Sequence, residues 1–225
     1  MKLQVVIPVK TNSERVQDKN LRPFHGRQSL LDIKTRQLIA SGISPKQIVL
    51  SSESERVAVV AKRYGARFAL RDIGLTYNET PWGEVVATLV SQAEAVTKAD
   101  TTLWITVTDP IFGAYRDVLN VWRDERKCYD SLVLVQRLSE FVMMPDGRPL
   151  NWGFGPWHVT SQNLGELYTC PLSCVIAPNN VIAANRYYIG RKPYLYKTEL
   201  PIVDIDTEND FARAQAVYRE QLKSG

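Results

Sequence analysis

Leu3-Gln4-Val5-Val6-Ile7-Pro8 is a short apolar run that ends at a proline, and such a run is typical of a strand buried in a sheet. The residues that follow it, 9–23, are mostly polar and predict a loop. Apolar residues at helical spacing then begin at Leu30 and stop at Gly42, which predicts a helix over 30–41. The start of the chain therefore predicts a strand, a polar loop and a helix, the first part of a βαβ unit.

The same alternation of short apolar runs and amphipathic stretches continues along the chain. It predicts strands at 47–51, 67–70, 102–107, 131–135, 194–196 and 202–203, and helices at 55–64, 82–96, 114–126 and 208–222. This order is typical of an α/β, Rossmann-like fold with a mostly parallel sheet and helices on both faces. Ligands bind such sheets at the carboxyl ends of the strands, so we expect chemistry just after Ile7, Leu50 and Val107, and after the last strand.

Residues 136–177 interrupt the alternation. They are rich in Pro, Gly, Trp and Tyr, and residues 145–157 read PDGRPLNWGFGPW. A disordered linker would contain few aromatic residues, so we expect an inserted β-rich arm instead. Arms of this kind often pack on a partner subunit, which predicts a homodimer. The alternative is that Trp152, Trp157 and Tyr168 fold back on their own sheet or line a ligand pocket.

The composition limits the classes of protein to which the chain can belong. Its 225 residues can bury one large core, so a single domain over residues 1–225 is expected. No apolar run approaches the roughly 20 residues that span a bilayer, and the N-terminus lacks the features of a signal peptide, which predicts a cytoplasmic protein that binds no membrane. The net charge of +4 comes from scattered Lys and Arg, which suits a polyanionic nucleotide better than a nucleic acid. Three cysteines without CxxC spacing indicate neither a disulfide framework nor a zinc site.

The loop after the first expected strand is the first candidate site. It contains four cations and several neutral donors, namely Lys10, Thr11, Asn12, Ser13, Arg15, Lys19 and Arg22. A triphosphate needs both kinds of partner, because charged side chains pair with its oxygens while hydroxyls and backbone amides wrap around them. No GxxxxGK[ST] motif is present, so the loop is not a P-loop. The alternative is a basic loop that contacts only solvent.

Carboxylates near the end of the chain form the second candidate site. Asp204 and Asp206 are two positions apart and can converge on one cation if the backbone turns there. Mg²⁺ prefers oxygen ligands and keeps several waters, so one or two carboxylates with phosphates suffice to hold it, and Mn²⁺ is the other candidate ion. Asp109 is a third candidate ligand because it follows the strand expected at 102–107. The alternatives are that the Asp-x-Asp pair caps the last helix together with Thr207, and that Asp109 forms a turn.

Several motifs resemble, in the same order along the chain, those of the acylneuraminate cytidylyltransferase family. Ile7-Pro8-Val9-Lys10, Ser13 and Lys19-Asn20 are similar to the strand, the serine and the Lys-Asn pair with which that family begins. Similar motifs follow at 50–55 (LSSESE), 61–66 (AKRYGA), 146–151 (DGRPLN), 161–164 (SQNL) and 203–211 (VDIDTENDF). No single motif is specific, but their shared order covers nearly the whole chain.

This resemblance implies a nucleotidyltransferase of the CMP-sugar synthetase type with the fold of nucleotide-diphospho-sugar transferases. Such an enzyme would transfer CMP from CTP to an acidic 2-keto sugar, either a nonulosonic acid or a Kdo-like sugar, and release pyrophosphate. The implied catalytic residues are Lys10, Lys19, Asp204 and Asp206. The implied nucleotide-binding residues are Lys10, Ser13, Arg15, Lys19, Asn20, Arg71, Thr80, Thr106 and Thr108, and the implied metal ligands are Asp204, Asp206 and Asp109. Thr80, followed by Pro81, is equally typical of a helix cap, and Arg71 of a surface arginine.

The chain also departs from the family at identifiable positions. Lys10 stands where the family has Arg, and Thr11 and Asn12 stand where it has glycines. Residues 106–112 lack the Gln and the Arg of the family's corresponding motif, so the residues that face the sugar differ more than those that face the nucleotide. Three alternatives stay open: a nucleotidyltransferase with a different acceptor, a metal-dependent glycosyltransferase, and an inactive relative that only binds nucleotide.

Overall fold

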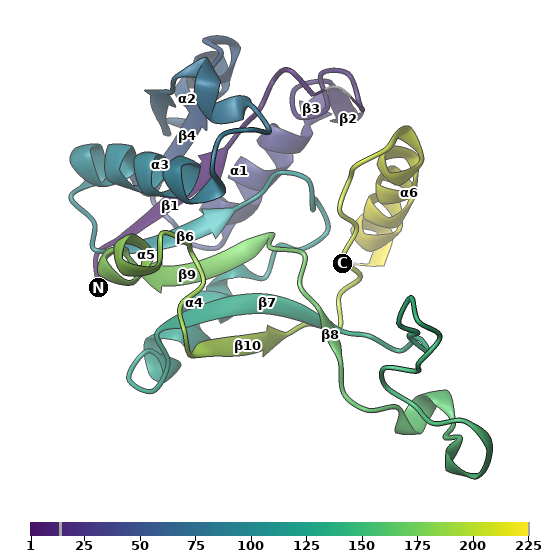
Figure 1. The fold of residues 1–225 in the computed structure, drawn as a ribbon. Coiled ribbons are helices and arrows are strands. Elements are labelled where there is room, and N and C mark those ends of the chain that lie inside the picture. The colour runs from purple at the N-terminus through teal and green to yellow at the C-terminus, as the bar shows by residue number, and fades with distance from the viewer. Residues whose placement is uncertain (14, 225) are drawn as a thin grey trace.

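β1 (Leu3–Pro8) lies in the middle of the central sheet of the computed structural model, which describes residues 1–13 and 15–224 (Figure 1). The strand order across the sheet is β10-β7-β9-β6-β1-β4-β5, and β8 pairs with β7. The other strands of this sheet are β4 (Ile48–Ser52), β5 (Arg67–Leu70), β6 (Thr101–Ile105), β7 (Ser131–Arg137), β8 (Tyr168–Thr169), β9 (Cys174–Pro178) and β10 (Pro193–Lys197). A separate hairpin is formed by β2 (Pro23–His25) and β3 (Gln28–Ser29).

Most neighbouring strands of the central sheet run parallel. β1 pairs in parallel with β4 and β6, β4 with β5, and β7 with β10. β9 is antiparallel to both of its neighbours, β6 and β7. The predicted α/β class with a mostly parallel sheet is therefore confirmed.

Helices cover both faces of this sheet, as the sequence predicts (Figure 1). One face packs against α1 (Leu30–Ala40), α2 (Arg56–Tyr64), α4 (Tyr115–Glu125) and α6 (Glu208–Ser224), and the other against α3 (Trp82–Thr97) and α5 (Asn179–Asn185). The sequence analysis predicts all of these helices except α5, whose 7 residues are too few to show a periodic pattern. Within the described residues, no helix combines the length and the hydropathy that a bilayer crossing requires.

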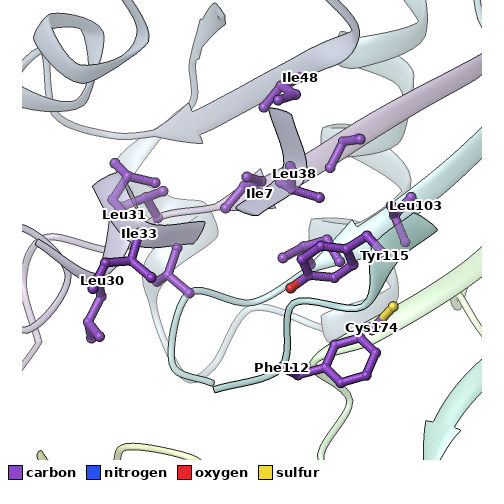
Figure 2. Close-up of a cluster of buried hydrophobic side chains, with 14 of the residues drawn as sticks. Ile7, Leu30, Leu31, Ile33, Leu38, Ile48, Leu103, Phe112, Tyr115 and Cys174 are labelled. Atoms are coloured by element: carbon purple, nitrogen blue, oxygen red, sulfur yellow. The ribbon is translucent and has the colours of Figure 1, made fainter. Parts of the chain in front are cut away.

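Each strand at the centre of the sheet contributes side chains to two separate cores. Ile7 of β1 and Leu103 of β6 face the first core, where they lie with Leu38 of α1 and Tyr115 of α4 (Figure 2). Val6, beside Ile7 in the same strand, faces the second core under α3. Because both faces are buried, these strands are mostly apolar and lack the polar alternation of a half-exposed sheet, and the buried side chains of Gln4 and Thr102 hydrogen-bond to each other.

The arm leaves the sheet after β7, extends away from it and returns as β9 (Figure 1). Its regular structure consists of β8, one bridge between Met143 and Pro149, and two short 3-10 turns at Gly155–Trp157 and Ser161–Asn163. The prediction of a β-rich arm is therefore wrong in this respect, because prolines and glycines break the segment into turns. The predicted boundary at residue 177 is also wrong, because Cys174–Pro178 forms the buried strand β9.

The last segment before α6 differs from its prediction as well. Ile202 and Val203 do not belong to a strand, although Val203 and Ile205 are buried in the first core. The backbone amide of Ile205 donates a hydrogen bond of 3.0 Å to the carbonyl of Thr108. This contact places the residues around Ile205 beside the segment that follows β6.

Candidate functional site

A cavity of about 800 Å³ opens where β1, β5 and β6 end. The sequence analysis expects ligands at this edge of the sheet, because the loops that follow parallel strands diverge there. All nine predicted nucleotide-binding residues line the cavity: Lys10, Ser13, Arg15, Lys19, Asn20, Arg71, Thr80, Thr106 and Thr108. Residues from four separate segments of the chain are thus brought to one place.

Asn20 connects the two ends of the loop after β1. Its side-chain amide donates a hydrogen bond of 2.8 Å to the backbone carbonyl of Lys10. Its backbone carbonyl accepts a hydrogen bond of 3.2 Å from the backbone amide of Leu31. Asn20 is buried, and within the described residues its side-chain oxygen Oδ1 has no hydrogen-bond partner. A buried acceptor without a partner is costly, so this atom is suited to accept a donor from a ligand in the cavity.

Glu53 and Arg71 form a buried ion pair beneath the same loop. Their side chains are 6% and 3% exposed, and Arg71 Nη2 lies 3.2 Å from Glu53 Oε2. Glu53 Oε1 also accepts hydrogen bonds of 2.7 Å from the backbone amide and from the hydroxyl of Thr11. Burial acts to raise the pKa of Glu53, but the hydrogen bonds from Thr11 and the charge of Arg71 outweigh it and lower that pKa. Burial lowers the pKa of Arg71.

The pair therefore holds the start of the loop against the ends of β4 and β5. The Arg71 guanidinium also donates to the carbonyl of Val9 at 3.2 Å, which is the last residue before Lys10. Sequence reasoning missed this role of Glu53, because its pairing with Arg71 joins the ends of two strands 18 positions apart. The alternative that Arg71 is a surface arginine is wrong.

Asp206 contacts two cations of the loop. Arg15 Nη2 lies 2.8 Å and Lys19 Nζ 3.7 Å from the same carboxylate oxygen of Asp206. Lys19 also donates to the carbonyl of Ile205. Burial lowers the pKa of Lys19, and the charges of Asp206 and Asp204 offset part of this effect. The structure thus joins the predicted phosphate-binding loop to the predicted metal ligands.

Asp109 bonds to residues other than the two candidate ligands near the end of the chain. Its side chain is fully buried, and it accepts hydrogen bonds from the Ser173 hydroxyl at 3.0 Å and from the backbone amide of Phe112 at 3.4 Å. Within the described residues, no group of three His, Cys, Asp or Glu side chains is arranged to hold a metal ion. The structure therefore does not bring Asp109 together with Asp204 and Asp206, and it gives Asp109 a role in fastening residues 109–112 to the start of β9.

The part of the cavity near α3 has a different character. It is lined by Leu75, Thr76, Tyr77, Asn78, Glu79, Thr80, Pro81, Trp82 and Val85, with Thr106, Val107 and Thr108 after β6. None of these residues is a lysine or an arginine. Thr80 does not cap α3, because Pro81 is at the N-cap position and the Thr80 hydroxyl donates to the carbonyl of Gly74 at 2.5 Å. Sequence reasoning missed Tyr77 and Glu79, which lie between β5 and α3, and Trp82, which is the first residue of α3.

Comparisons with known proteins show which sequence family and which folds the chain resembles. Residues 4–102 match the model of a family described as cytidylyltransferase. No curated protein sequence matches the chain. A CMP:2-keto-3-deoxy-manno-octonic acid synthetase complexed with CTP shares the fold, with a TM-score of 0.65 and 11% identity over 98% of this chain and 100% of that one.

Two further solved structures have the same fold. The first is 4-diphosphocytidyl-2C-methyl-D-erythritol synthase from Anaerococcus prevotii, with a TM-score of 0.64 and 11% identity over 96% of this chain and 98% of that one. The second is apo UDP-glucose pyrophosphorylase, with a TM-score of 0.62 and 8% identity over 98% of this chain and 99% of that one. The chain therefore combines a cytidylyltransferase sequence pattern over residues 4–102 with a fold that these three proteins share over nearly its whole length.

Proposed function

We propose that this protein transfers CMP from CTP to a hydroxyl of an acidic 2-keto sugar and releases pyrophosphate. The observation that carries this proposal is the clustering of Lys10, Arg15, Lys19 and Arg71 in one cavity next to the carboxylate of Asp206. A triphosphate needs several cations, and the family match over residues 4–102 supports cytosine as the base. The first of the three solved structures was determined with CTP, which supports the same substrate.

In the proposed reaction the acceptor oxygen bonds to the α-phosphorus of CTP while the bond from that phosphorus to the bridging oxygen of pyrophosphate breaks. The acceptor hydroxyl releases its proton to solvent. The protein contributes mainly by positioning the two substrates and by neutralising charge. Lys10, Arg15 and Lys19 pair with phosphate oxygens, and Asn20 Oδ1 accepts a hydrogen bond from the cytosine amino group or from a ribose hydroxyl.

Asp204 and Asp206 are the residues that would hold Mg²⁺ or Mn²⁺. Asp204 is exposed and Asp206 is partly exposed, and two carboxylates completed by phosphate oxygens and waters are a suitable donor set for such an ion. When bound, a divalent cation neutralises charge on the triphosphate. Asp109 is left out of this set because its carboxylate is buried against Ser173.

A second candidate is a nucleotidyltransferase with a neutral acceptor. It is favoured by the lack of lysine and arginine among the cavity residues 75–82 and 106–108, since a sugar carboxylate next to these residues would have no cationic partner among them. The arm of a second subunit could supply such a partner. We therefore propose a two-fold dimer in which the exposed arm, with Phe154 and Trp157 at its surface, helps to close the neighbouring cavity.

The test is release of pyrophosphate from CTP, UTP, ATP or GTP with Mg²⁺ and a panel of acidic and neutral sugars. We expect release with CTP and an acidic sugar, and higher turnover than with any other nucleotide. Turnover of CTP with the neutral sugars and with none of the acidic sugars would favour the second candidate. Binding of CTP without release of pyrophosphate would identify an inactive relative, and transfer from a nucleotide-sugar would identify a glycosyltransferase.

A further inference from the structure

A second cavity, of about 590 Å³, opens between the β2–β3 hairpin, α1 and the second half of α6. It shares no lining residue with the candidate functional site. Two arginines, two glutamines and a histidine line it together with apolar and aromatic side chains, and its lining contains no aspartate or glutamate. A cavity of this size and mixed character is typical of a site for a small metabolite.

The elements around this second cavity are fastened to one another. The side-chain amide of Gln215 in α6 donates a hydrogen bond of 2.6 Å to the backbone carbonyl of Phe24 in β2. The ring of Tyr218, also in α6, packs edge-on against Phe24 and against His25, with centroids 5.7 Å and 5.5 Å apart. Tyr218 and His25 both line the cavity, so one of its walls is held in place before any ligand binds.

The two arginines of this cavity, Arg27 in the hairpin turn and Arg36 in α1, are exposed cations. Within the described residues, neither of them forms an ion pair. Asp32 lies one turn before Arg36 in α1, but its Oδ1 pairs with Arg63 at 2.7 Å and its Oδ2 accepts a hydrogen bond from Ser29. The charge of both arginines is therefore left for an anion from outside the chain.

Gln37 adds a hydrogen-bond acceptor to the lining. Its Nε2 donates a hydrogen bond of 2.7 Å to the backbone carbonyl of Pro110, which fixes the orientation of the amide. Within the described residues, Gln37 Oε1 is buried and has no hydrogen-bond partner. A buried acceptor without a partner is costly, so this atom is suited to accept a hydrogen bond from a ligand hydroxyl.

We propose that this second cavity binds a sugar phosphate, with the phosphate paired to Arg27 and Arg36, a hydroxyl donating to Gln37 and the sugar packed on Tyr218. A phosphate monoester carries nearly a double negative charge and three oxygens, so it can pair with two guanidinium groups, whereas one arginine satisfies a carboxylate. Inorganic phosphate alone would fill only a small part of about 590 Å³, which favours a phosphate on a larger body. The proposal does not depend on the proposed function, because the two cavities share no residue.

The test uses His25 as a probe, since its ring lies in the wall of the cavity and the chain contains two histidines in all. The proton NMR signal of its imidazole C2–H is followed at constant pH and ionic strength while ribose 5-phosphate is added. The signal is assigned with His25→Gln. His158, which stacks on Phe141 in the arm, is the internal control. Ribose, ribonate and inorganic phosphate are titrated separately, so that the sugar, a carboxylate and the phosphate are each tested alone.

The variants Arg27→Gln and Arg36→Gln each remove one cation at an exposed position, where the fold should tolerate the change. The matched control is Arg213→Gln, which removes an exposed cation of α6 outside the cavity. Arg15→Gln removes a cation from the candidate functional site, and it tests whether the phosphate binds there instead.

We expect ribose 5-phosphate to shift the His25 signal saturably and to leave the His158 signal in place. Arg27→Gln and Arg36→Gln should each raise its Kd by about ten-fold or more, and Arg213→Gln and Arg15→Gln by less than about two-fold. Ribose should not bind, and ribonate and inorganic phosphate should bind more weakly. An unshifted His25 signal, or an unchanged Kd in Arg27→Gln and Arg36→Gln, would overturn the proposal. Ribonate or inorganic phosphate binding as tightly as ribose 5-phosphate would overturn the assignment to a sugar phosphate.

Discussion

Arg15 Nη2 lies 2.8 Å from Asp206 Oδ1, so two residues 191 positions apart in the chain form an ion pair beside the cavity. Lys19 approaches the same oxygen at 3.7 Å. The side chains of Arg15 and Asp206 are 70% and 46% exposed, and an ion pair this accessible contributes no more than about 1 kcal/mol to stability. If a triphosphate and its metal ion bind here, as proposed, they can therefore replace this pair at little cost.

We predict that Asp204→Asn and Asp206→Asn each lower the rate of pyrophosphate release by about 100-fold or more, because each removes a carboxylate from the proposed metal site. Steady-state kinetics at saturating CTP measure the effect, and circular dichroism checks the fold. The control is Asp124→Asn. Asp124 is an exposed carboxylate of α4 that does not line the cavity, so its replacement should leave both the rate and the fold unchanged. If the first two variants lost only stability, both residues would be structural.

We predict that Glu53→Gln destabilises the fold by about 3 kcal/mol and weakens CTP binding, because it leaves the Arg71 guanidinium buried without its anionic partner. Urea denaturation measures the first effect and calorimetry with CTP the second. Glu55→Gln is the control, since Glu55 is exposed and makes no side-chain cap at the start of α2. Equal CTP affinities for the two variants would show that the Glu53–Arg71 pair does not position the loop.

Buried Lys34 predicts a dependence of stability on pH. Its Nζ donates to the carbonyl of Phe112 at 2.9 Å and to the hydroxyl of Tyr115 at 2.7 Å, and burial lowers the pKa of Lys34 from 10.5 to about 8 despite the charge of Asp109. The unfolded chain then binds more protons than the folded one between these two pH values, so stability rises with pH across this window. The destabilising contribution of the buried Lys34 ammonium is fully present below about pH 8 and absent above about pH 10.5.

We therefore expect the free energy of unfolding, relative to that of Lys34→Met, to rise by about 3 kcal/mol between pH 7 and pH 10.5. Burial raises the pKa of Tyr115 well above its usual range and that of Cys174 to about 12. Over this pH range both groups therefore ionise only in the unfolded chain, in the wild-type protein and in Lys34→Met alike. Their contributions cancel in the difference. A difference that stays constant over this range would mean that Lys34 keeps an ordinary pKa.

We predict a dimer held by the arm. Light scattering at micromolar concentration should give twice the chain mass of 25.5 kDa. Trp157→Ser should raise the dimer dissociation constant by about ten-fold, because Trp157 is 76% exposed in the single chain and aromatic anchors dominate interfaces. Val59→Ser, an exposed apolar position on α2, is the control and should leave the mass unchanged. A monomer mass that persists on concentrating the sample would contradict the proposed dimer.

Local patterns were sufficient to predict much of this protein. Buried parallel strands are mostly apolar runs, so β1, β4, β5, β6 and β7 of the central sheet followed from periodicity. The edge at which the cavity opens followed from the rule for strand ends. The predicted nucleotide-binding residues, from Lys10 to Thr108, line one cavity for the same reason. Their roles in binding stay predictions.

Features that depend on long-range pairing were missed. Cys174–Pro178 is as apolar as β1, but its aromatic and proline-rich neighbours placed it in the arm, and only its pairing with β6 and β7 identifies it as a central strand. The direction of the Asp109 side chain depends on Ser173, which is 64 positions away. The same holds for Trp82, whose orientation is set by two residues from other parts of the chain.

The position of β9 between β6 and β7 has a consequence for synthesis on the ribosome. When β6 leaves the ribosome it can pair with β1, but its other edge stays open until β9 follows about 70 residues later, roughly 4–14 s at ordinary rates of translation. An apolar strand with an open edge is a template for pairing with other chains. The nascent protein is therefore most exposed to aggregation, and most in need of chaperones, while its own arm is being made.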